Sequence, residues 1–336
     1  MKKFNIAIVG ATGNVGREIL KILFQRNFPI NKIELVASKK SEGIKISFGK
    51  KFLKVKSLDS FNFKNIDIVL SSSGSKVSKE FVPKATKSGS VVIDNTSYFR
   101  MIKDIPLVVP EVNPESIKNF KKKRIIANPN CSTIQLVTAL KPLHDEFNIK
   151  RIIVSTYQST SGAGKSAMDE LFHQTLDVYR KNVSKPKIFT KNIAFNVIPH
   201  IDEFLKDGET KEEWKMVVET KKILDPKIEV FATCVRVPVF IGHGESINIE
   251  TEKPINFKTA VNILKKSRGI AVVDTRKDGG YISPDESAGE DDVFVSRIRK
   301  DKSVKNGLAL WVAADNLRKG AALNSVQIAE ELIKIL

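Results

Sequence analysis

The stretch Phe4-Asn5-Ile6-Ala7-Ile8-Val9-Gly10-Ala11-Thr12-Gly13-Asn14-Val15-Gly16 decides the fold of this chain. It begins as a short β-rich run, and helical periodicity follows over Val15–Gln25. The glycines are spaced G-x-x-G-x-x-G, a relative of the dinucleotide fingerprint, in which they allow a tight turn and close backbone approach to a pyrophosphate. A glycine-rich turn in another kind of α/β protein is the alternative. The residues expected to line a nucleotide-binding loop are Gly10, Thr12, Gly13, Asn14 and Val15.

The rest of the N-terminal part alternates β-rich runs with amphipathic segments. We expect strands at Ile33–Ala37, Ile66–Leu70 and Val91–Asp94, and a helix at Val77–Lys87. Alternation of this kind indicates a parallel sheet with helices on both faces, so the fold class is α/β with an N-terminal Rossmann-type domain.

From about residue 150 the pattern changes to β-rich runs with few helices between them. The expected strands are Arg151–Tyr157, Glu229–Val237, Glu245–Glu250, Gly269–Val273, Asp292–Ile298 and Leu308–Ala313. Such a series predicts an antiparallel or mixed sheet in a second, α+β domain. We place the first domain at residues 1–130, completed by a C-terminal helix at 315–336, and the second at 131–314. No low-complexity linker separates them, so we expect a tight join, where clefts commonly form.

Composition indicates an ordinary globular protein: of 336 residues, 41% are hydrophobic and 28% charged. No apolar run approaches the length of a membrane span. The N-terminus leads directly into the first strand, which predicts no signal peptide, and the two cysteines form no disulfide framework. We therefore expect reduced thiols and a cytoplasmic location. No His, Cys or carboxylate cluster has metal-ligand spacing, so no metal is expected.

The net charge is unusual, with 56 basic and 38 acidic residues giving a formal charge of +18. This excess suggests nucleic-acid binding as one hypothesis. The lysines are scattered, however, and the densest cluster, Lys121–Arg124, is short and accompanies no nucleic-acid-binding motif. A solvated lysine-rich surface, whose positive field attracts phosphorylated small molecules, is the favoured interpretation.

The end of the second expected strand indicates which nucleotide binds. An NAD site usually has an Asp or Glu there for the ribose hydroxyls. This chain has Ser38, Lys39, Lys40 and Ser41 instead, with no carboxylate before Glu42. Hydroxyls and lysines suit a 2′-phosphate, so NADP(H) is favoured over NAD(H), although loop lysines often only face water.

Asn128-Pro129-Asn130-Cys131-Ser132-Thr133 places one of the two cysteines in the expected first turn of a helix. Unpaired backbone N–H groups and the positive end of the helix dipole favour the thiolate there, and the thiolate is the nucleophile. The same N–H groups can hold an oxyanion. The alternative is a small buried hydrophobic residue, as we expect for Cys234.

Two further residue types suit acyl chemistry. His243, flanked by glycines, has a neutral-range pKa that suits a proton shuttle. Arginine at positions 100 and 236 suits bidentate capture of phosphate or carboxylate. Arg236 interrupts the apolar run Val230–Val239, where a charge requires a partner or a ligand. The other three histidines are expected to be structural.

A series of motifs runs from residue 5 to about 330, and it comprises Gly10–Gly16, Asp94–Arg100, Val109–Asn113, Asn128–Gln135, Tyr157–Gly164, Glu219–Ile223, Cys234–Pro238, His243 and Trp311–Gly320. Together they resemble the aspartate-β-semialdehyde dehydrogenase family. The Asn128 and Tyr157 blocks are the most specific. The loop containing Tyr98 and the Glu219 block look like the Gram-positive style branch of that family. Nothing is carried over to the segment Lys181–Lys191.

The resemblance implies a glyceraldehyde-3-phosphate-dehydrogenase-like catalytic and dimerisation domain in a homodimer or homotetramer. It implies NADP-dependent, phosphate-dependent interconversion of L-aspartate 4-semialdehyde and L-4-aspartyl phosphate, on the route to lysine, methionine, threonine and isoleucine. Cys131 corresponds to the nucleophile, His243 to the acid/base partner and Gln158 to the residue that orients the acyl-enzyme. The remaining correspondences are Arg236 and Glu219 for the substrate carboxylate and amino group, Arg100, Asn130 and Lys222 for the phosphate, and Ser161, Gly162 and Asn316 for the cofactor.

The chemistry agrees with these residue types, because a thioester accepts hydride better than a carboxylate does. One rival is N-acetyl-γ-glutamyl-phosphate reductase, whose substrate has no free amino group for Glu219 to bind. Another is a catalytically silent nucleotide-sensing or nucleic-acid-binding protein on the same scaffold.

Overall fold

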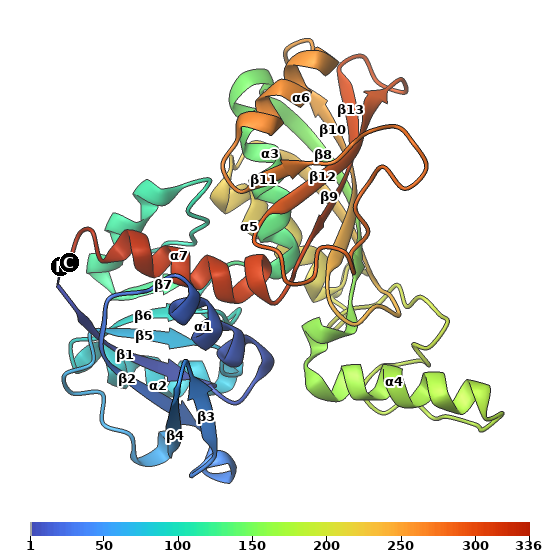
Figure 1. Ribbon diagram of the computed structural model, residues 1–336. Coiled ribbons are helices and arrows are strands. Elements are labelled where there is room, and N and C mark those ends of the chain that lie inside the picture. The colour runs from blue at the N-terminus through green and yellow to red at the C-terminus, as the bar shows by residue number, and fades with distance from the viewer. Residues whose placement is uncertain (1) are drawn as a thin grey trace. The chain divides into compact units, whose positions relative to one another are not determined.

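The computed structural model describes residues 2–336, and the chain forms two compact units (Figure 1). The first comprises Met1–Asn130 with Ala321–Leu336, and the second Cys131–Gly320. The first break therefore falls at the expected position. Residues 315–320 belong to the second unit, however, and the last helix begins later than the sequence suggested, at Leu323.

The first unit contains a seven-stranded sheet in the order β3-β4-β2-β1-β5-β6-β7. Its strands are β1 Phe4–Val9, β2 Ile30–Ala37, β3 Lys45–Phe48, β4 Lys51–Ser57, β5 Ile68–Ser71, β6 Val91–Asp94 and β7 Ile125–Ala127. All neighbours are parallel except β3 and β4. The predicted Rossmann-type sheet is confirmed. The β3–β4 pair was not predicted, because its lysine-rich strands lie at the sheet edge and carry few buried apolar residues.

Helices complete the first unit. They are α1 Asn14–Gln25, α2 Ser75–Lys87 and α7 Leu323–Leu332, with the 3-10 turns η1 Lys39–Ser41, η2 Leu58–Ser60 and η3 Pro114–Lys122. Ile19 and Leu23 of α1 share one apolar core with Val326 and Leu332 of α7. Each such fully buried side chain stabilises the fold by about 1.5–3 kcal/mol. The last helix of the chain is therefore part of the first sheet's core.

The second unit contains a six-stranded sheet in the order β11-β12-β13-β10-β8-β9. Its strands are β8 Ile149–Gln158, β9 Glu229–Arg236, β10 His243–Thr251, β11 Ile270–Val272, β12 Val293–Asp301 and β13 Gly307–Ala314. Two pairs, β8–β9 and β11–β12, are parallel and the others antiparallel. The predicted mixed sheet is confirmed.

Three helices pack on one face of this sheet. The helices of the unit are α3 Cys131–Phe147, α4 Lys165–Tyr179, α5 Lys211–Ile223 and α6 Phe257–Lys266, with η4 Thr160–Ala163. The π-helical turn η5 Arg318–Ala322 begins in this unit and ends in the first. Leu140 of α3, Met216 of α5 and Leu264 of α6 enter a core with the inward side chains of the strands. The helix α4 lies apart from this layer (Figure 1).

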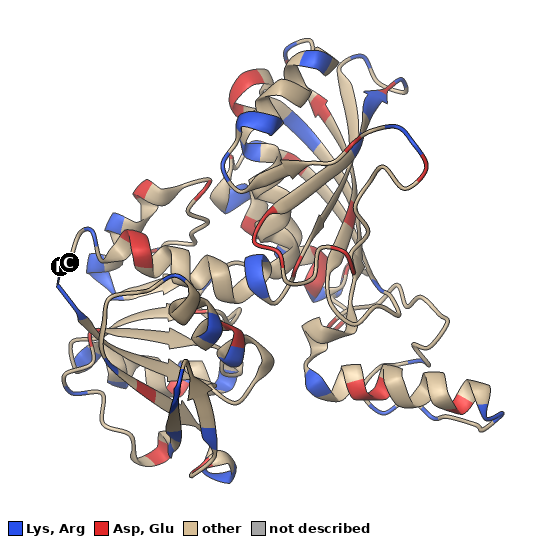
Figure 2. Ribbon diagram, in the orientation of Figure 1, with Lys and Arg blue, Asp and Glu red and all other residues tan. Residues whose placement is uncertain are grey.

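Figure 2 shows Lys and Arg distributed over helices, strands and loops of each unit rather than collected in one stripe. Over residues 2–336 no helix has both the length and the apolar character required to cross a membrane. The same residues contain no group of three or more His, Cys, Asp or Glu side chains arranged to hold a metal ion.

Candidate active site

Cys131 is the first residue of α3, and three residues separate it from the end of β7. The first turn of α3 contains no acidic residue, so the positive end of the helix dipole is not offset locally. Cys131 is half-buried, whereas the second cysteine is fully buried. Its neighbour on one side is Gly320, where a Cβ would stand 2.9 Å from the Cβ of Cys131. Residue 320 therefore has to lack a side chain for Cys131 to occupy this place.

Cys234 is a packing residue, as expected. It lies on β9 with no accessible surface, and burial raises the pKa of its thiol well above the ordinary range. Since the thiolate is the reactive form, this cysteine is chemically inert in the folded chain.

The carboxyl ends of β8 and β9 meet at one edge of the second sheet, because the two strands are parallel. Gln158 and Arg236 are the last residues of these strands and are paired in register. Strand β10 is antiparallel to β8 and begins at His243, so its first residue reaches the same edge. Three expected site residues that are far apart in sequence thus lie together.

The α3 helix reaches this edge too. Gln135, one turn after Cys131, approaches the backbone carbonyl of His243 with its amide nitrogen at 3.5 Å. The charge of Arg236 also interacts with the Cys131 sulfur. The structure therefore brings Cys131, His243, Gln158 and Arg236 together in the second unit.

The ring of His243 is fully buried and held from one side. Its Nδ1 accepts a hydrogen bond from the backbone N–H of Ser159 at 3.1 Å, and the Ser159 hydroxyl lies 3.0 Å away. Because a backbone N–H can only donate, we assign the neutral tautomer that carries its proton on Nε2. Burial, followed by the charge of Arg236, lowers the pKa of His243 to about 3. The ring is therefore neutral near pH 7.

The Nε2 atom of His243 is buried beside Gly162. It has no hydrogen-bond partner among residues 2–336. A Cβ on Gly162 would stand 3.4 Å from this Nε2 and 3.1 Å from Nη1 of Arg236. A glycine at position 162 therefore avoids crowding both groups.

A hydrogen-bond network supports the histidine from behind. The side-chain oxygen of Asn316 accepts from the hydroxyls of Ser159 and Ser161, each at 3.1 Å, and from the N–H of Gly242 at 2.9 Å. The amide of Asn316 donates to Ser161 at 2.9 Å. Since Gly242 precedes His243 and Ser159 binds its ring, this network fixes the imidazole in position and orientation.

Glu219 and Lys222 lie three residues apart on α5. Glu219 is buried, and burial lowers the pKa of Lys222 while the charge of Glu219 opposes that shift. The pair therefore offers one acidic and one basic group from the same helix.

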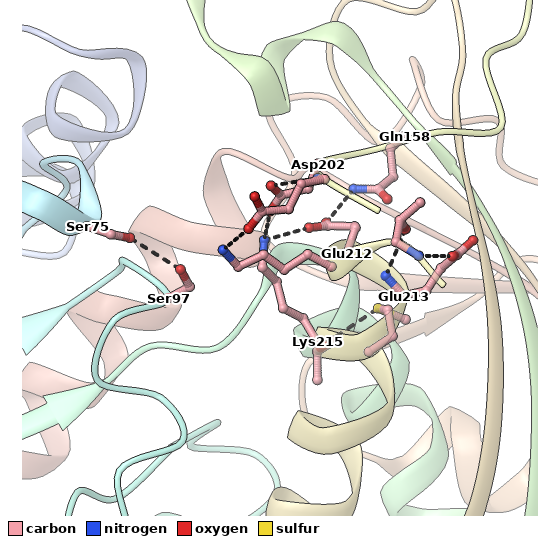
Figure 3. A network of polar contacts seen from close by, with 12 residues as sticks. Ser75, Ser97, Gln158, Asp202, Glu212, Glu213 and Lys215 are labelled. Carbon is pink, nitrogen blue, oxygen red and sulfur yellow. Dashed lines mark hydrogen bonds and ion pairs between the residues drawn. The ribbon is translucent and has the colours of Figure 1, made fainter. Parts of the chain in front are cut away.

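The sequence did not reveal three charged residues next to Gln158. Glu212, Lys215 and Asp202 form a chain of ion pairs that runs from the buried Glu212 to the exposed Asp202 (Figure 3). In the sequence Glu212 belongs to a capping-box pattern that begins at Thr210, and that pattern signals only the start of a helix. Nothing local predicted that its carboxylate would face the end of β8.

The loop after β1 in the first unit fits a dinucleotide. Gly10 has a φ of +85°, and a Cβ there would stand 2.9 Å from Ser72. A Cβ on Gly16 would stand 2.3 Å from the carbonyl oxygen of Gly10. Gly13 caps α1 without a side-chain hydrogen bond, and the first turn holds no acidic residue. The helix N-terminus is therefore available to a phosphate group.

The residues after β2 fit a further phosphate. Ser38, Lys39 and Lys40 are exposed around the η1 turn, and Thr12 of the glycine loop lies 3.4 Å from Ser41, hydroxyl to hydroxyl. Two exposed cations beside hydroxyl groups could hold a phosphate group.

Two expected phosphate-binding residues also belong to the first unit. Arg100 is buried and donates from Nε to the carbonyl of Asn128 at 2.9 Å and from Nη2 to that of Asn95 at 2.7 Å. Asn130 is buried and immediately precedes Cys131. The third expected phosphate ligand, Lys222, belongs to the second unit.

Comparison with known proteins shows which family has this combination of domains. The family described as "Semialdehyde dehydrogenase, NAD binding domain" matches residues 5–120, and "Semialdehyde dehydrogenase, dimerisation domain" matches residues 140–319. The chain is 54% identical to an aspartate-semialdehyde dehydrogenase of Rickettsia bellii, with 99% of this chain and 98% of the relative covered. The chain belongs to the aspartate-semialdehyde dehydrogenase family. It is an oxidoreductase of that family.

Other members give the same result. The aspartate-semialdehyde dehydrogenase of Aquifex aeolicus is 55% identical, with 98% of each chain covered. A crystal structure of aspartate semialdehyde dehydrogenase II from Vibrio cholerae superimposes with a TM-score of 0.97 at 48% identity, with 99% of each chain covered. Relatives of this similarity across the whole chain favour the aspartate-semialdehyde dehydrogenase family over the N-acetyl-γ-glutamyl-phosphate reductase alternative.

Proposed function

We propose that the enzyme reduces L-4-aspartyl phosphate to L-aspartate 4-semialdehyde with NADPH, reversibly, through a thioester on Cys131. This places it on the route to lysine, methionine and threonine. The observation that carries the proposal is the edge of the second sheet, where Gln158, Arg236 and His243 converge on the helix that begins with Cys131. The relatives described above are aspartate-semialdehyde dehydrogenases, which supports this substrate.

The first step is acyl transfer to sulfur. The Cys131 thiolate attacks the acyl carbon, a C–S bond forms, and the bond between that carbon and the phosphate oxygen breaks. Inorganic phosphate, which takes up a proton, leaves. The Nε2–H of His243 donates a hydrogen bond to the oxyanion of the tetrahedral species, and the Gln158 amide orients the acyl group.

The second step releases the aldehyde. NADPH, when bound, supplies the hydride that reduces the thioester carbon. The resulting oxyanion again accepts a hydrogen bond from the Nε2–H of His243, which serves as the acid/base partner. Collapse then breaks the C–S bond and restores the Cys131 thiolate, so no net change occurs at the enzyme.

Charged side chains recognise the rest of the substrate. Arg236 is proposed to bind the carboxylate and Glu219 the amino group, because both are buried charges in the same unit as Cys131. The proposed ligands of the phosphate are Arg100, Asn130 and Lys222. Ser161, Gly162 and Asn316 are proposed to contact the cofactor, and their network with His243 supports that position.

The coenzyme is proposed to be NADP(H) rather than NAD(H). The residues expected to hold it are Gly10, Thr12, Gly13, Asn14, Val15, Ser38, Lys39, Lys40 and Ser41. A solved aspartate semialdehyde dehydrogenase from Candida albicans, 25% identical with a TM-score of 0.76 and 99% of each chain covered, was crystallised with NADP. The exposed lysines after β2 support the same choice here.

Assembly, location and branch are also proposals. A homodimer, or a homotetramer built from it, is supported by the dimerisation domain that the second unit matches. We propose a cytoplasmic location for an enzyme with reduced cysteines. The relatives named above come from Rickettsia, Aquifex and Vibrio, and they lend no support to the Gram-positive style branch, which stays a prediction.

Replacement of Cys131 by serine tests the function. The variant is expected to lose nearly all turnover of L-aspartate semialdehyde with NADP and phosphate, while NADPH binding, followed by fluorescence, stays intact. N-acetyl-glutamate semialdehyde serves as the competing substrate for the wild-type enzyme. Turnover of the acetylated substrate alone, or substantial activity in Cys131→Ser, would show that the proposal is wrong.

A further inference from the structure

The segment that follows α4 reaches the proposed substrate site through one side chain. No role was assigned to Lys181–Lys191 from the sequence, and none of the steps proposed above uses it. The guanidinium carbon of Arg236, however, lies over the ring of Phe189, 5.9 Å from the ring centroid. Arg236 is the residue proposed to bind the substrate carboxylate. A half-buried aromatic ring from the unassigned segment is therefore part of its surroundings.

Two buried side chains of α4 hold this segment in place. Oε2 of Glu170 accepts the backbone N–H groups of residues 187 and 188 at 3.0 and 2.6 Å. One turn further along the helix, Oε1 of Gln174 accepts those of residues 193 and 194 at 2.7 and 3.2 Å. The Gln174 amide also donates to Oε1 of Glu170 at 3.1 Å, so the two acceptors fix each other. These two side chains form the α4 clamp, and Phe189 lies between the two pairs of residues that it holds.

Packing connects the ring of Phe189 with the strand that carries the arginine. The ring packs against a small apolar cluster of three buried side chains, Leu171, Ile193 and Ile198. Ile198 also pairs with Arg236 through two backbone hydrogen bonds, in which each N–H donates to the other residue's carbonyl, at 2.9 and 2.8 Å. The position of the ring relative to the guanidinium is therefore determined by backbone pairing and packing together.

The ring and one backbone carbonyl restrict how a ligand can bind the guanidinium. Nη1 of Arg236 donates to the carbonyl of Ser159 at 2.8 Å. The face of an aromatic ring is electron-rich, so it attracts the cation and repels an anion. A carboxylate is therefore excluded from the face that Phe189 covers. It has to approach the edge of the guanidinium plane, where the remaining N–H groups can bind both of its oxygens.

Burial increases the effect of this contact. Only 6% of the surface of Arg236 is exposed, and burial lowers the pKa of its guanidinium because water stabilises the charge poorly there. A cation–π contact is stronger at such a place than at an exposed site. The ring also occupies none of the N–H groups that a substrate carboxylate needs.

We propose that Phe189 is a positioning residue for substrate recognition, which covers one face of the Arg236 guanidinium and directs the substrate carboxylate to its edge. The α4 clamp presents the ring, so α4, which lies apart from the helical layer, serves the site indirectly (Figure 1). This inference rests on the role proposed above for Arg236. It gives the unassigned segment a function in binding substrates that carry a carboxylate.

The test is a double-mutant cycle of Phe189→Leu and Arg236→Ala, assayed with L-aspartate semialdehyde, phosphate and NADP. Rates are expressed per active site, counted by alkylation of Cys131, so that misfolded protein does not contribute. Leucine keeps the apolar packing and removes the ring face. Phe189→Leu is expected to raise the KM for the semialdehyde about fivefold to tenfold, with kcat within about twofold of wild type, because the carboxylate is bound equally in the ground and transition states. The KM values for phosphate and NADP should not change.

The double variant shows whether the ring acts through the arginine. Once Arg236 is replaced by alanine, the guanidinium that the ring covers is gone. Adding Phe189→Leu to Arg236→Ala is therefore expected to change kcat/KM for the semialdehyde by less than about twofold. A purely structural effect of Phe189→Leu would persist in both backgrounds.

Two further variants at the same position keep the experiment decisive. Phe189→Met fills a similar volume without a ring, and it takes the place of Phe189→Leu if that variant folds poorly. Phe189→Tyr retains the ring and is expected to restore most of the affinity that Phe189→Leu loses. A wild-type KM for the semialdehyde in the folded leucine or methionine variant overturns the inference, and so does an equal loss in Phe189→Tyr.

Phe195→Leu is the matched control. Phe195 lies six residues further along the same segment and is 64% exposed, and its ring contacts that of Tyr179 edge to face with the centroids 6.1 Å apart. The same substitution at this position should leave kcat and KM per active site unchanged. Equal rises of KM in Phe189→Leu and Phe195→Leu would mean that loosening of the segment is the cause, and the inference would be wrong.

The outcomes also separate this inference from the proposed function. Wild-type kcat/KM in Arg236→Ala contradicts the role proposed for Arg236, and the inference is rejected with it. A low kcat/KM in Arg236→Ala combined with fully multiplicative losses in the double variant rejects the inference about Phe189 alone.

Discussion

Replacement of Gly320 by alanine tests the placement of the proposed nucleophile. A Cβ at residue 320 would stand 2.9 Å from the Cβ of Cys131 and 3.3 Å from its Cα. Two such carbons need about 3.5–4.0 Å, so the new methyl group has to push Cys131 away by roughly 0.6–1 Å. The backbone carbonyl of Cys131, 3.5 Å from the same point, blocks the easiest way out.

A displacement of this size is large for a reacting atom. Misplacement by about 1 Å costs on the order of 100-fold in rate, equivalent to about 2.7 kcal/mol of transition-state stabilisation. We therefore expect Gly320→Ala to lower kcat by about 10- to 100-fold. The rate at which iodoacetamide alkylates Cys131, followed by mass spectrometry of quenched samples, is expected to fall in parallel, because the sulfur leaves its place at the start of α3.

Gly307→Ala is the control with a comparable clash. A Cβ there would stand 2.5 Å from Val304 and 2.8 Å from Asp301, in the hairpin between β12 and β13. Gly307 lies at the far end of β13 from Ala314, the partner of His243, roughly 20 Å away at about 3.3 Å per residue. Both variants should melt at lower temperatures, but only Gly320→Ala should lose activity. A folded Gly320→Ala enzyme with wild-type kcat and alkylation rate refutes the geometric reasoning.

Three further experiments test the electrostatics. Burial raises the pKa of Glu245 well above its ordinary value, and the Gln135 amide opposes only part of that shift. The protonated carboxyl therefore stabilises the fold fully only below its unfolded pKa of about 4.3. Above that pH, its contribution to the free energy of unfolding falls by about 1.36 kcal/mol per pH unit until the pH reaches the folded pKa. The melting temperature of Glu245→Gln should accordingly exceed that of wild type by more at pH 8 than at pH 5; an equal difference at both would contradict a neutral buried acid. Joint replacement of Lys39 and Lys40 by alanine should raise the KM for NADPH about tenfold and leave that for NADH unchanged, and equal effects on both coenzymes would argue against 2′-phosphate recognition. Alkylation of the native protein should label one cysteine per chain, because burial keeps Cys234 as an unreactive thiol; a second label under native conditions contradicts its burial.

Local patterns in the sequence were sufficient for much of this protein. The glycine spacing after β1 predicted a nucleotide-binding loop, because each glycine has a steric reason that depends only on its near neighbours. Cys131 was predicted at the start of a helix for a similarly local reason. The alternation of strands and helices predicted the Rossmann-type sheet and the mixed sheet. Roles for Gln158, Glu219 and Asn316 came from resemblance to a family, since nothing in their own neighbourhoods indicates them.

Tertiary structure alone decided the rest. Gln158 and Arg236 become neighbours through strand register, a property of two segments that no local pattern contains. The tautomer of His243 depends on a backbone N–H of Ser159. The contact between Glu212 and Gln158 depends on how α5 packs on β9. Sequence periodicity specifies which face of a segment is buried, but partners across a sheet or between a helix and a sheet are determined only when the whole core packs. For this reason the elements could be predicted from the sequence, while the hydrogen bonds that orient the site could not.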